Sequence, residues 1–191
     1  MSYFVFVEFQ NENVNSFLTD LRNALQQNIK SSPIHVTIRG PYAKVPAASE
    51  LSDVRELLRG NGVRINGHGQ FKTQNGFAVF VRAECSAFKK VWDKPDYKSS
   101  LESIQPHITL YESADPAAAK QVLKFLKAEK LLIYTYDVVL RVYASRQEEM
   151  FGAPLVAPQD HHPPLRSDYW SVREDVIARA GELGARLARS G

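Results

Sequence analysis

The sequence of 191 residues predicts an α+β fold made of two related lobes. Hydrophobic residues make up 44% of the chain and charged residues 24%, which are the proportions of an ordinary globular domain. Strand-like and helix-like segments alternate along the chain. A short tetrad occurs once in each half, as His-Val-Thr-Ile at 35–38 and as His-Ile-Thr-Leu at 107–110. The repeated tetrad indicates that the two halves are related.

The first predicted elements are a buried strand and an amphipathic helix. Residues 3–9 are apolar enough for the strand, and apolar side chains follow a 3.6-residue period over 13–30. We expect Asn13 or Asn15 to cap this helix. The first tetrad then begins a second strand, and the Gly-Pro-Tyr run at 40–42 is expected to turn the chain out of it.

The remainder of the first half predicts a helix, a hairpin and a short helix. Leucine and valine spacing favours a helix over 49–58, which the following Gly-Asn-Gly run ends. Two β-rich runs at 63–72 and 77–83 form a predicted hairpin, because the Asn-Gly pair at 75–76 is a strong turn signal. A short helix is expected over 86–92.

The second half repeats the order of strand, helix and strand. The second tetrad begins a strand, and Asp115 followed by Pro116 marks the start of a helix that runs to about residue 129. Residues 131–143 are rich in strong β-formers and predict one long strand region.

The chain changes character after residue 145. We therefore expect a two-lobed domain over 1–145, a proline-rich extended linker over 146–166 and a C-terminal segment over 167–191. Apolar residues on one stripe over 168–189 predict an amphipathic helix within that segment. This helix could dock on its own domain, pair with another subunit or bind an anionic surface, and docking is the interpretation we favour.

Composition narrows the class of protein and of ligand. The formal net charge is +3 and the pI is about 8.9, a mild basic excess that suits an anionic ligand without demonstrating nucleic-acid binding. The single cysteine, Cys85, excludes an internal disulfide and a multi-cysteine metal site. No apolar run approaches the length that spans a membrane, so we expect a cytoplasmic protein without a membrane partner.

The tetrads carry the residues that acid–base chemistry needs. In a strand, residues i and i+2 face the same side, so each tetrad should place its His beside its Thr while the aliphatics turn inward. Two imidazoles with pKa values of about 6.5 can act at neutral pH as one base and one acid. If both tetrads line one cleft, the imidazoles can flank a phosphodiester while the threonine hydroxyls bind its non-bridging oxygens.

A metal site is the competing use of two histidines. Zinc would need a third protein ligand, and the only carboxylate close to His107 in the second strand is Glu112. Five residues along a regular strand would place Glu112 on the face opposite His107. We therefore expect neither a metal nor another cofactor.

Three further residues near the tetrads are candidates for substrate binding. Alternation places Arg39 on the face of the first tetrad's His and Thr, and Tyr111 on the corresponding face of the second strand. Tyr42 directly follows the first strand. The arginine could contact a phosphate and the tyrosines could stack on a base, whereas a solvated arginine and packing tyrosines are the alternatives. His68 could touch substrate, but a hairpin histidine is usually just exposed.

The two tetrads resemble the defining motifs of the 2H phosphoesterase superfamily, two His-x-Thr/Ser-x sequences that each end in a hydrophobic residue. Pro106 before the second motif is also typical, and the resemblance covers about residues 1–145. It implies a bilobal fold, with antiparallel sheets lining a central cleft and helices outside. It also implies metal-independent chemistry at 2′-phosphoryl linkages, with His35 and His107 as acid and base and with Thr37 and Thr109 as phosphate binders.

One departure from the family bears on the substrate. RNA-ligase-like members often carry an arginine soon after the second motif, whereas here Tyr111 and Glu112 follow it and Arg39 follows the first motif. This departure favours a small nucleotide over the end of a long RNA.

The predicted activity is hydrolysis of a 2′-phosphodiester in a nucleotide or short oligonucleotide, such as a 2′,3′-cyclic phosphate, a 2′-5′ linkage or a cyclic oligonucleotide. RNA remains a possible partner, and the oligomeric state is open. Two alternatives stay open as well: a 2′-5′ RNA ligase using the same cleft, and a module that binds a cyclic nucleotide without turnover.

Overall fold

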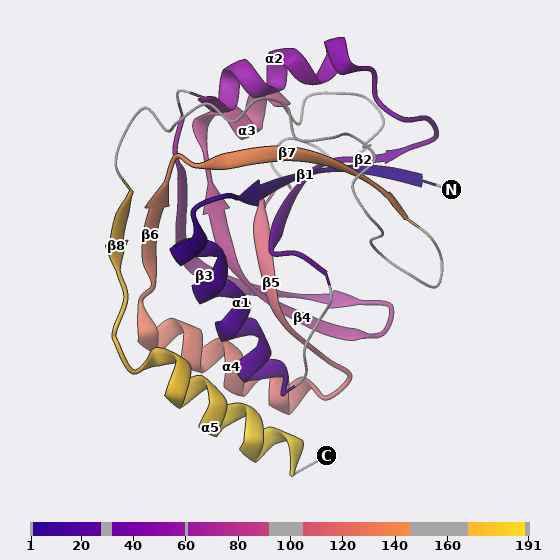
Figure 1. Cartoon of the computed structure of the whole chain (residues 1–191). Coiled ribbons are helices and arrows are strands. Elements are labelled where there is room, and N and C mark those ends of the chain that lie inside the picture. Colours follow the sequence, from indigo (N-terminus) through magenta and orange to yellow (C-terminus); the bar gives the residue numbers. More distant parts are fainter. Residues whose placement is uncertain (1, 28–31, 60, 92–104, 146–167, 190–191) are drawn as a thin grey trace.

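The computed structural model describes residues 2–27, 32–59, 61–91, 105–145 and 168–189. It is an α+β structure with two antiparallel sheets and helices that pack against them (Figure 1). In chain order the elements are β1 (Ser2–Phe9), α1 (Glu12–Gln26), β2 (His35–Tyr42), α2 (Ala48–Arg59), β3 (Val63–Thr73), β4 (Gly76–Glu84), α3 (Ser86–Val91), β5 (His107–Ser113), α4 (Pro116–Glu129), β6 (Leu132–Thr135), β7 (Val138–Ser145), β8 (Tyr169–Ser171) and α5 (Val176–Ala188).

The smaller sheet has the strand order β2-β1-β7, and β1 pairs antiparallel with both neighbours. Alternate residues of β1 contribute to the hydrophobic core, and α2 and α3 pack against β7 and β2. The predicted first two strands are confirmed. The expected turn at 40–42 is wrong, because β2 continues to its end opposite Tyr3, and irregular pairing absorbs the extra residues around Gly40 (φ 121°).

Helix α1 begins earlier than predicted, because its N-cap precedes the two expected cap residues. Asn11 is the N-cap, and its side chain accepts a hydrogen bond of 3.1 Å from the Val14 N–H. The expected caps Asn13 and Asn15 instead lie inside the helix. The helix ends at Gln26, since Gln27 adopts the left-handed conformation (φ 55°), and residues 28–30 of the predicted helix lie outside the described residues.

The larger sheet has the order β5-β4-β3-β6-β8 and curls into a half-barrel (Figure 1). Its β3–β4 hairpin is confirmed, and Gly76 occupies the turn position with a φ of 139° that side chains rarely adopt. Helix α4 packs on one face of β3, β4 and β5. Its predicted start is confirmed too, because the Asp115 side chain accepts hydrogen bonds from the N–H groups of Ala117 and Ala118.

The predicted long strand over 131–143 is two strands in different sheets. It breaks at Tyr136 and Asp137, so that β6 joins the larger sheet and β7 joins the smaller one. The Tyr136 N–H donates to the carboxylate of Asp168 (3.0 Å), and the Asp137 carbonyl accepts from the Gln10 N–H (2.9 Å). These hydrogen bonds to residues far away in the sequence stabilise the break between the two strands. Local β propensity does not predict them.

The expected helix over 168–189 is wrong at its beginning. Asp168 bonds to both Tyr136 and the Asn11 side chain (2.8 Å), and the next residues form β8 at the edge of the larger sheet. Helix α5 follows and packs mainly on α1, with Gly184 permitting a close approach to the carbonyl of Ala24. The helix therefore docks on its own domain. The proline-rich linker lies outside the described residues.

The helices of the described residues are amphipathic or short, and each large one buries an apolar stripe against a sheet or another helix. None of them is both long and apolar enough to cross a membrane.

Candidate active site

The two tetrad strands contact each other although they belong to different sheets. Both β2 and β5 are edge strands, and the tetrad is at the start of each, so His35 and His107 are the first residues of their strands. Figure 1 shows the beginning of β2 beside β5. The fold thus brings together two segments that are far apart in the sequence.

Each tetrad has the same register against its neighbouring strand. In the smaller sheet Thr37 lies opposite Phe6, and in the larger sheet Thr109 lies opposite Phe80. The His and Thr side chains are half-buried, whereas all four aliphatic side chains of the tetrads are buried. The predicted sharing of one face by His and Thr is confirmed in both strands.

The fourth residue of each tetrad sits in a β-bulge. Pairing passes from Thr37 opposite Phe6 to Arg39 opposite Val5, which leaves the residue between them as an extra one. In β5 the pairing likewise skips the leucine at position 110. A bulge changes the phase of side-chain alternation, so Arg39 in β2 and the residues of β5 after the tetrad lie on the face opposite to the one a regular strand would give them. In β2 a second irregularity between Arg39 and Tyr42 restores the original phase.

The bulges overturn the predicted positions of the lesser candidates. Arg39 (7% exposed) and Tyr111 (8% exposed) are paired with buried valines on the face opposite the tetrad His and Thr. Tyr42 lies opposite Tyr3, which places it on that same inner face and partly against the core. The prediction for Glu112 is also wrong, in the opposite sense. Glu112 lies opposite Ala78, on the same face as the second His and Thr.

The two imidazoles are anchored in the same way. The Nδ1 of His35 lies 2.8 Å from the Pro33 carbonyl oxygen, and the Nδ1 of His107 lies 2.7 Å from the Gln105 carbonyl oxygen. A carbonyl oxygen only accepts, so Nδ1 carries the proton in each ring. The Nε2 atom of each neutral ring is then the one that can take up a proton.

Aromatic rings of the neighbouring strands support both imidazoles. Phe6 stacks on His35 with ring centroids 3.9 Å apart and an interplanar angle of 18°. Phe80 and Phe71 contact His107 at centroid distances of 4.7 and 5.1 Å. Gly69 makes room for this arrangement, because a Cβ atom there would meet the Phe80 ring at 2.3 Å. These supporting rings were not predicted from the sequence, although their cross-strand positions follow once the pairing of the strands is known.

Burial lowers the pKa of both imidazoles. For His35, the positive charges of Arg22 and of a protonated His107 lower the pKa further, against an upward contribution from the bond to Pro33. For His107, the bond to Gln105 is the opposing contribution. The charge effect of one imidazole on the other means that they are close enough to interact.

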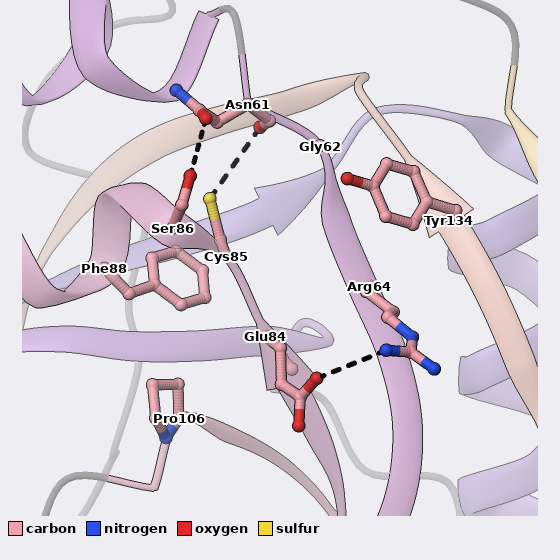
Figure 2. Close-up of a pocket in the computed structure, with 10 residues that line it drawn as sticks. Asn61, Gly62, Arg64, Glu84, Cys85, Ser86, Phe88, Pro106 and Tyr134 are labelled. Carbon is pink, nitrogen blue, oxygen red and sulfur yellow. Dashed lines mark hydrogen bonds and ion pairs between the residues drawn. The ribbon is translucent and has the colours of Figure 1, made fainter.

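A cavity of about 590 Å³ lies next to the second tetrad but does not include it (Figure 2). Pro106 forms part of its wall. Within it, the Ser86 hydroxyl donates to the Asn61 side chain (2.6 Å), and burial raises the pKa of the Cys85 thiol. The thiol is therefore a poor nucleophile. The lining residues are Asn61, Gly62, Arg64, Ala83, Glu84, Cys85, Ser86, Phe88, Pro106 and Tyr134.

Other histidines and possible metal ligands stand apart from the pair. His68 lies opposite Val81, on the face that α4 covers, and burial together with the charge of Lys127 lowers its pKa. Across the described ranges, no group of three or more His, Cys, Asp or Glu side chains could hold a metal ion. The remaining histidines, His161 and His162, lie outside those ranges.

A polar cluster beside the first tetrad was not predicted from the sequence. Glu8 lies directly opposite His35, accepts a hydrogen bond from the Tyr143 hydroxyl (2.5 Å) and pairs with Arg141 (3.7 Å). The signal that could have found the cluster is a charged residue inside each of two apolar strands, Glu8 in β1 and Arg141 in β7.

Comparisons with known proteins do not assign the chain. No protein-family model matches it, and a search of curated proteins found no match. The functional argument therefore depends on the geometry of the tetrads.

Proposed function

We propose that this protein is a 2H-type phosphoesterase that hydrolyses a 2′-phosphodiester of a nucleotide or short oligonucleotide without a metal ion. In this proposal the two sheets form two pseudo-symmetric lobes, and the tetrads face a central cleft between them. One observation carries the proposal: two adjacent edge strands present a half-buried His and Thr with the same register, the same bulge and the same Nδ1 anchor.

The chemistry requires one proton to be removed and one to be donated. For a 2′,3′-cyclic phosphate, Nε2 of one imidazole takes a proton from water as its oxygen bonds to phosphorus. The bond from phosphorus to the 3′ oxygen breaks, and the other imidazole donates a proton to that oxygen, which leaves a 2′-phosphate. The hydroxyls of Thr37 and Thr109 donate hydrogen bonds to the non-bridging oxygens, where charge develops.

The electrostatics support a division of roles between the imidazoles. Burial lowers the pKa of both imidazoles, and the positive charge of Arg22 lowers that of His35 as well. We assign His35 as the base and His107 as the acid for cyclic-phosphate hydrolysis. In the reverse direction the roles exchange, since the same groups must return the protons.

The first experiment is phosphorus NMR of the purified protein in EDTA, separately with 2′,3′-cyclic AMP and with a 2′-5′-linked oligoadenylate. Loss of the cyclic-phosphate resonance and growth of a 2′-monophosphate is the expected result. Cleavage of the oligoadenylate alone would move the substrate to 2′-5′ linkages. Unchanged spectra combined with tight binding would contradict hydrolysis and support a module that binds without turnover. Joining of RNA ends that carry a 2′,3′-cyclic phosphate and a 5′-hydroxyl would favour a ligase.

A further inference from the structure

The Glu8–Arg141–Tyr143 cluster occupies the same face of the smaller sheet as the first tetrad. In β1, Glu8 lies opposite His35 and Phe6 lies opposite Thr37. On its other side Phe6 lies opposite Arg141, and Phe4 lies opposite Tyr143. Since directly paired residues of an antiparallel sheet face the same side, the cluster and the tetrad share one surface.

The cluster is costly to keep without a ligand. The side chains of Glu8 and Arg141 are each only 15% exposed, and burial raises the pKa of Glu8 against the opposing effects of Tyr143 and Arg141. The Nη1 atom of Arg141 is buried and has no hydrogen-bond partner among the described residues. A buried donor without a partner costs about 1–3 kcal/mol, so a partner for this atom would remove a real penalty.

The position of the cluster matches one part of a bound nucleotide. Thr37, Phe6 and Arg141 form a row across three adjacent strands, and a strand spacing of about 4.8 Å separates the ends of the row by about 10 Å. A phosphate held at Thr37 would therefore place its nucleoside over this row. The neighbouring carboxylate disfavours a second anion there and favours a neutral group that has both donors and acceptors.

We propose that Glu8 and Arg141 form a base-recognition subsite for the nucleotide whose phosphate lies between His35 and His107, and that guanine is the best-fitting base. This inference rests on the proposed function. The guanidinium donates to O6 of guanine, and the carboxylate accepts from N1–H and N2–H, which lie next to O6 on the same edge. The hydrogen bond from Tyr143 orients the carboxylate for this role.

The larger sheet offers no matching cluster at the corresponding place. The residue opposite His107 is Arg82, which is exposed, and the residue opposite Phe80 on the far strand is Gly69, where no side chain can contact a base. The base of the nucleotide is therefore expected on the β1 and β7 side of the cleft.

The test compares the four 2′,3′-cyclic nucleotides with guanine, adenine, cytosine and uracil bases as substrates. The natural protein should have its highest kcat/KM with the guanine substrate. Glu8→Gln and Arg141→Lys should each lower that value by on the order of 10- to 100-fold, and should change the other three values only a few-fold. Arg141→Lys keeps the positive charge beside Glu8, so it isolates the loss of the Nη1 donor. An equal loss on all four substrates would overturn the proposal.

Glu84→Gln is the matched control. Glu84 also pairs with an arginine, Arg64 (3.9 Å), but the side chains are 54% and 47% exposed and lie in the other sheet. This variant should leave the base preference unchanged.

Binding separates failure of the subsite from failure of the proposed catalysis. Calorimetric titration with guanosine 2′-monophosphate and adenosine 2′-monophosphate needs no turnover. Tighter guanosine binding that Glu8→Gln abolishes would uphold the subsite even if no substrate is hydrolysed. Equal affinity for both ligands in the natural protein would overturn the subsite even if hydrolysis is observed.

Discussion

The two tetrad strands are alike in what surrounds the imidazole and different in what lies beside it. Both β2 and β5 are edge strands with a bulge at the fourth tetrad residue and a phenylalanine opposite the threonine. On the neighbouring strand, however, the residue opposite His35 is the half-buried Glu8, whereas the residue opposite His107 is the exposed Arg82. Under the proposed function, the shared features would serve the chemistry at phosphorus, and the features found in only one strand would distinguish the two sides of the substrate.

The largest effect is expected from the imidazoles, because both tetrads must work for the reaction to proceed. His35→Ala and His107→Ala should each lower kcat by about 10²- to 10⁴-fold, since each removes a general acid or base. The steady-state rate with the best substrate found by phosphorus NMR is the measurement. His68→Ala, on the far face of the larger sheet, should retain activity. Near-normal turnover in either tetrad variant would show that the tetrads are not equivalent partners.

Removing either threonine hydroxyl should have a smaller effect than removing an imidazole, and the effect should be the same at both positions. Thr37→Val and Thr109→Val preserve shape and remove only the hydroxyl, so each should lower kcat/KM by up to about 10²-fold. The position of the pH optimum should not move, because neither hydroxyl titrates in that range. A loss at only one of the two positions would mean that a single sheet binds the phosphate.

The pH dependence should reflect the depressed pKa of both imidazoles. The active form carries one proton on the pair, and this form is most populated between the two pKa values of the pair. Since burial lowers both from the ordinary value of about 6.5, the maximum of kcat/KM should lie below that pH and fall as the pH rises further. A profile of kcat/KM in metal-free buffers measures this. A maximum above pH 7 would contradict the assignment.

The smallest effect is expected on stability, at a glycine that makes room for the ring supporting the second tetrad. Gly69→Ala forces a Cβ atom into the Phe80 ring that supports His107, and should lower the free energy of unfolding by about 1–3 kcal/mol. Gly181→Ala is the control, because no atom lies within 4 Å of its Cβ, and in a helix it should stabilise by about 0.5–1 kcal/mol. Chemical denaturation measures both. A neutral result for Gly69→Ala would mean that the Phe80 ring moves freely.

Periodicity in the sequence predicts most of the elements, because strands and helices with one buried face repeat their apolar residues at fixed intervals. It also predicts the faces of His35, Thr37, His107 and Thr109 correctly. It fails two residues after each threonine, at Arg39 and Tyr111, because a single inserted residue reverses the alternation.

Long-range bonds account for the other errors. The strand break at Tyr136 and the late start of α5 both depend on Asp168, which bonds to Tyr136 and Asn11. Local propensity depends only on neighbouring residues, so it does not predict hydrogen bonds to residues far away in the sequence. Glu8 and Arg141 were missed for the same reason, because each looks like an isolated charge until the pairing of β1 with β7 joins them.

The most direct test of the central claim is a double-mutant cycle on the two imidazoles, with kcat measured for the natural protein, His35→Ala, His107→Ala and the double variant in EDTA. Groups that act as one acid–base unit are strongly non-additive. The account predicts that the double variant loses little more than the worse single variant, with all four proteins equally folded. Losses that multiply, or a single variant with full activity, would show that His35 and His107 do not act on the same phosphate.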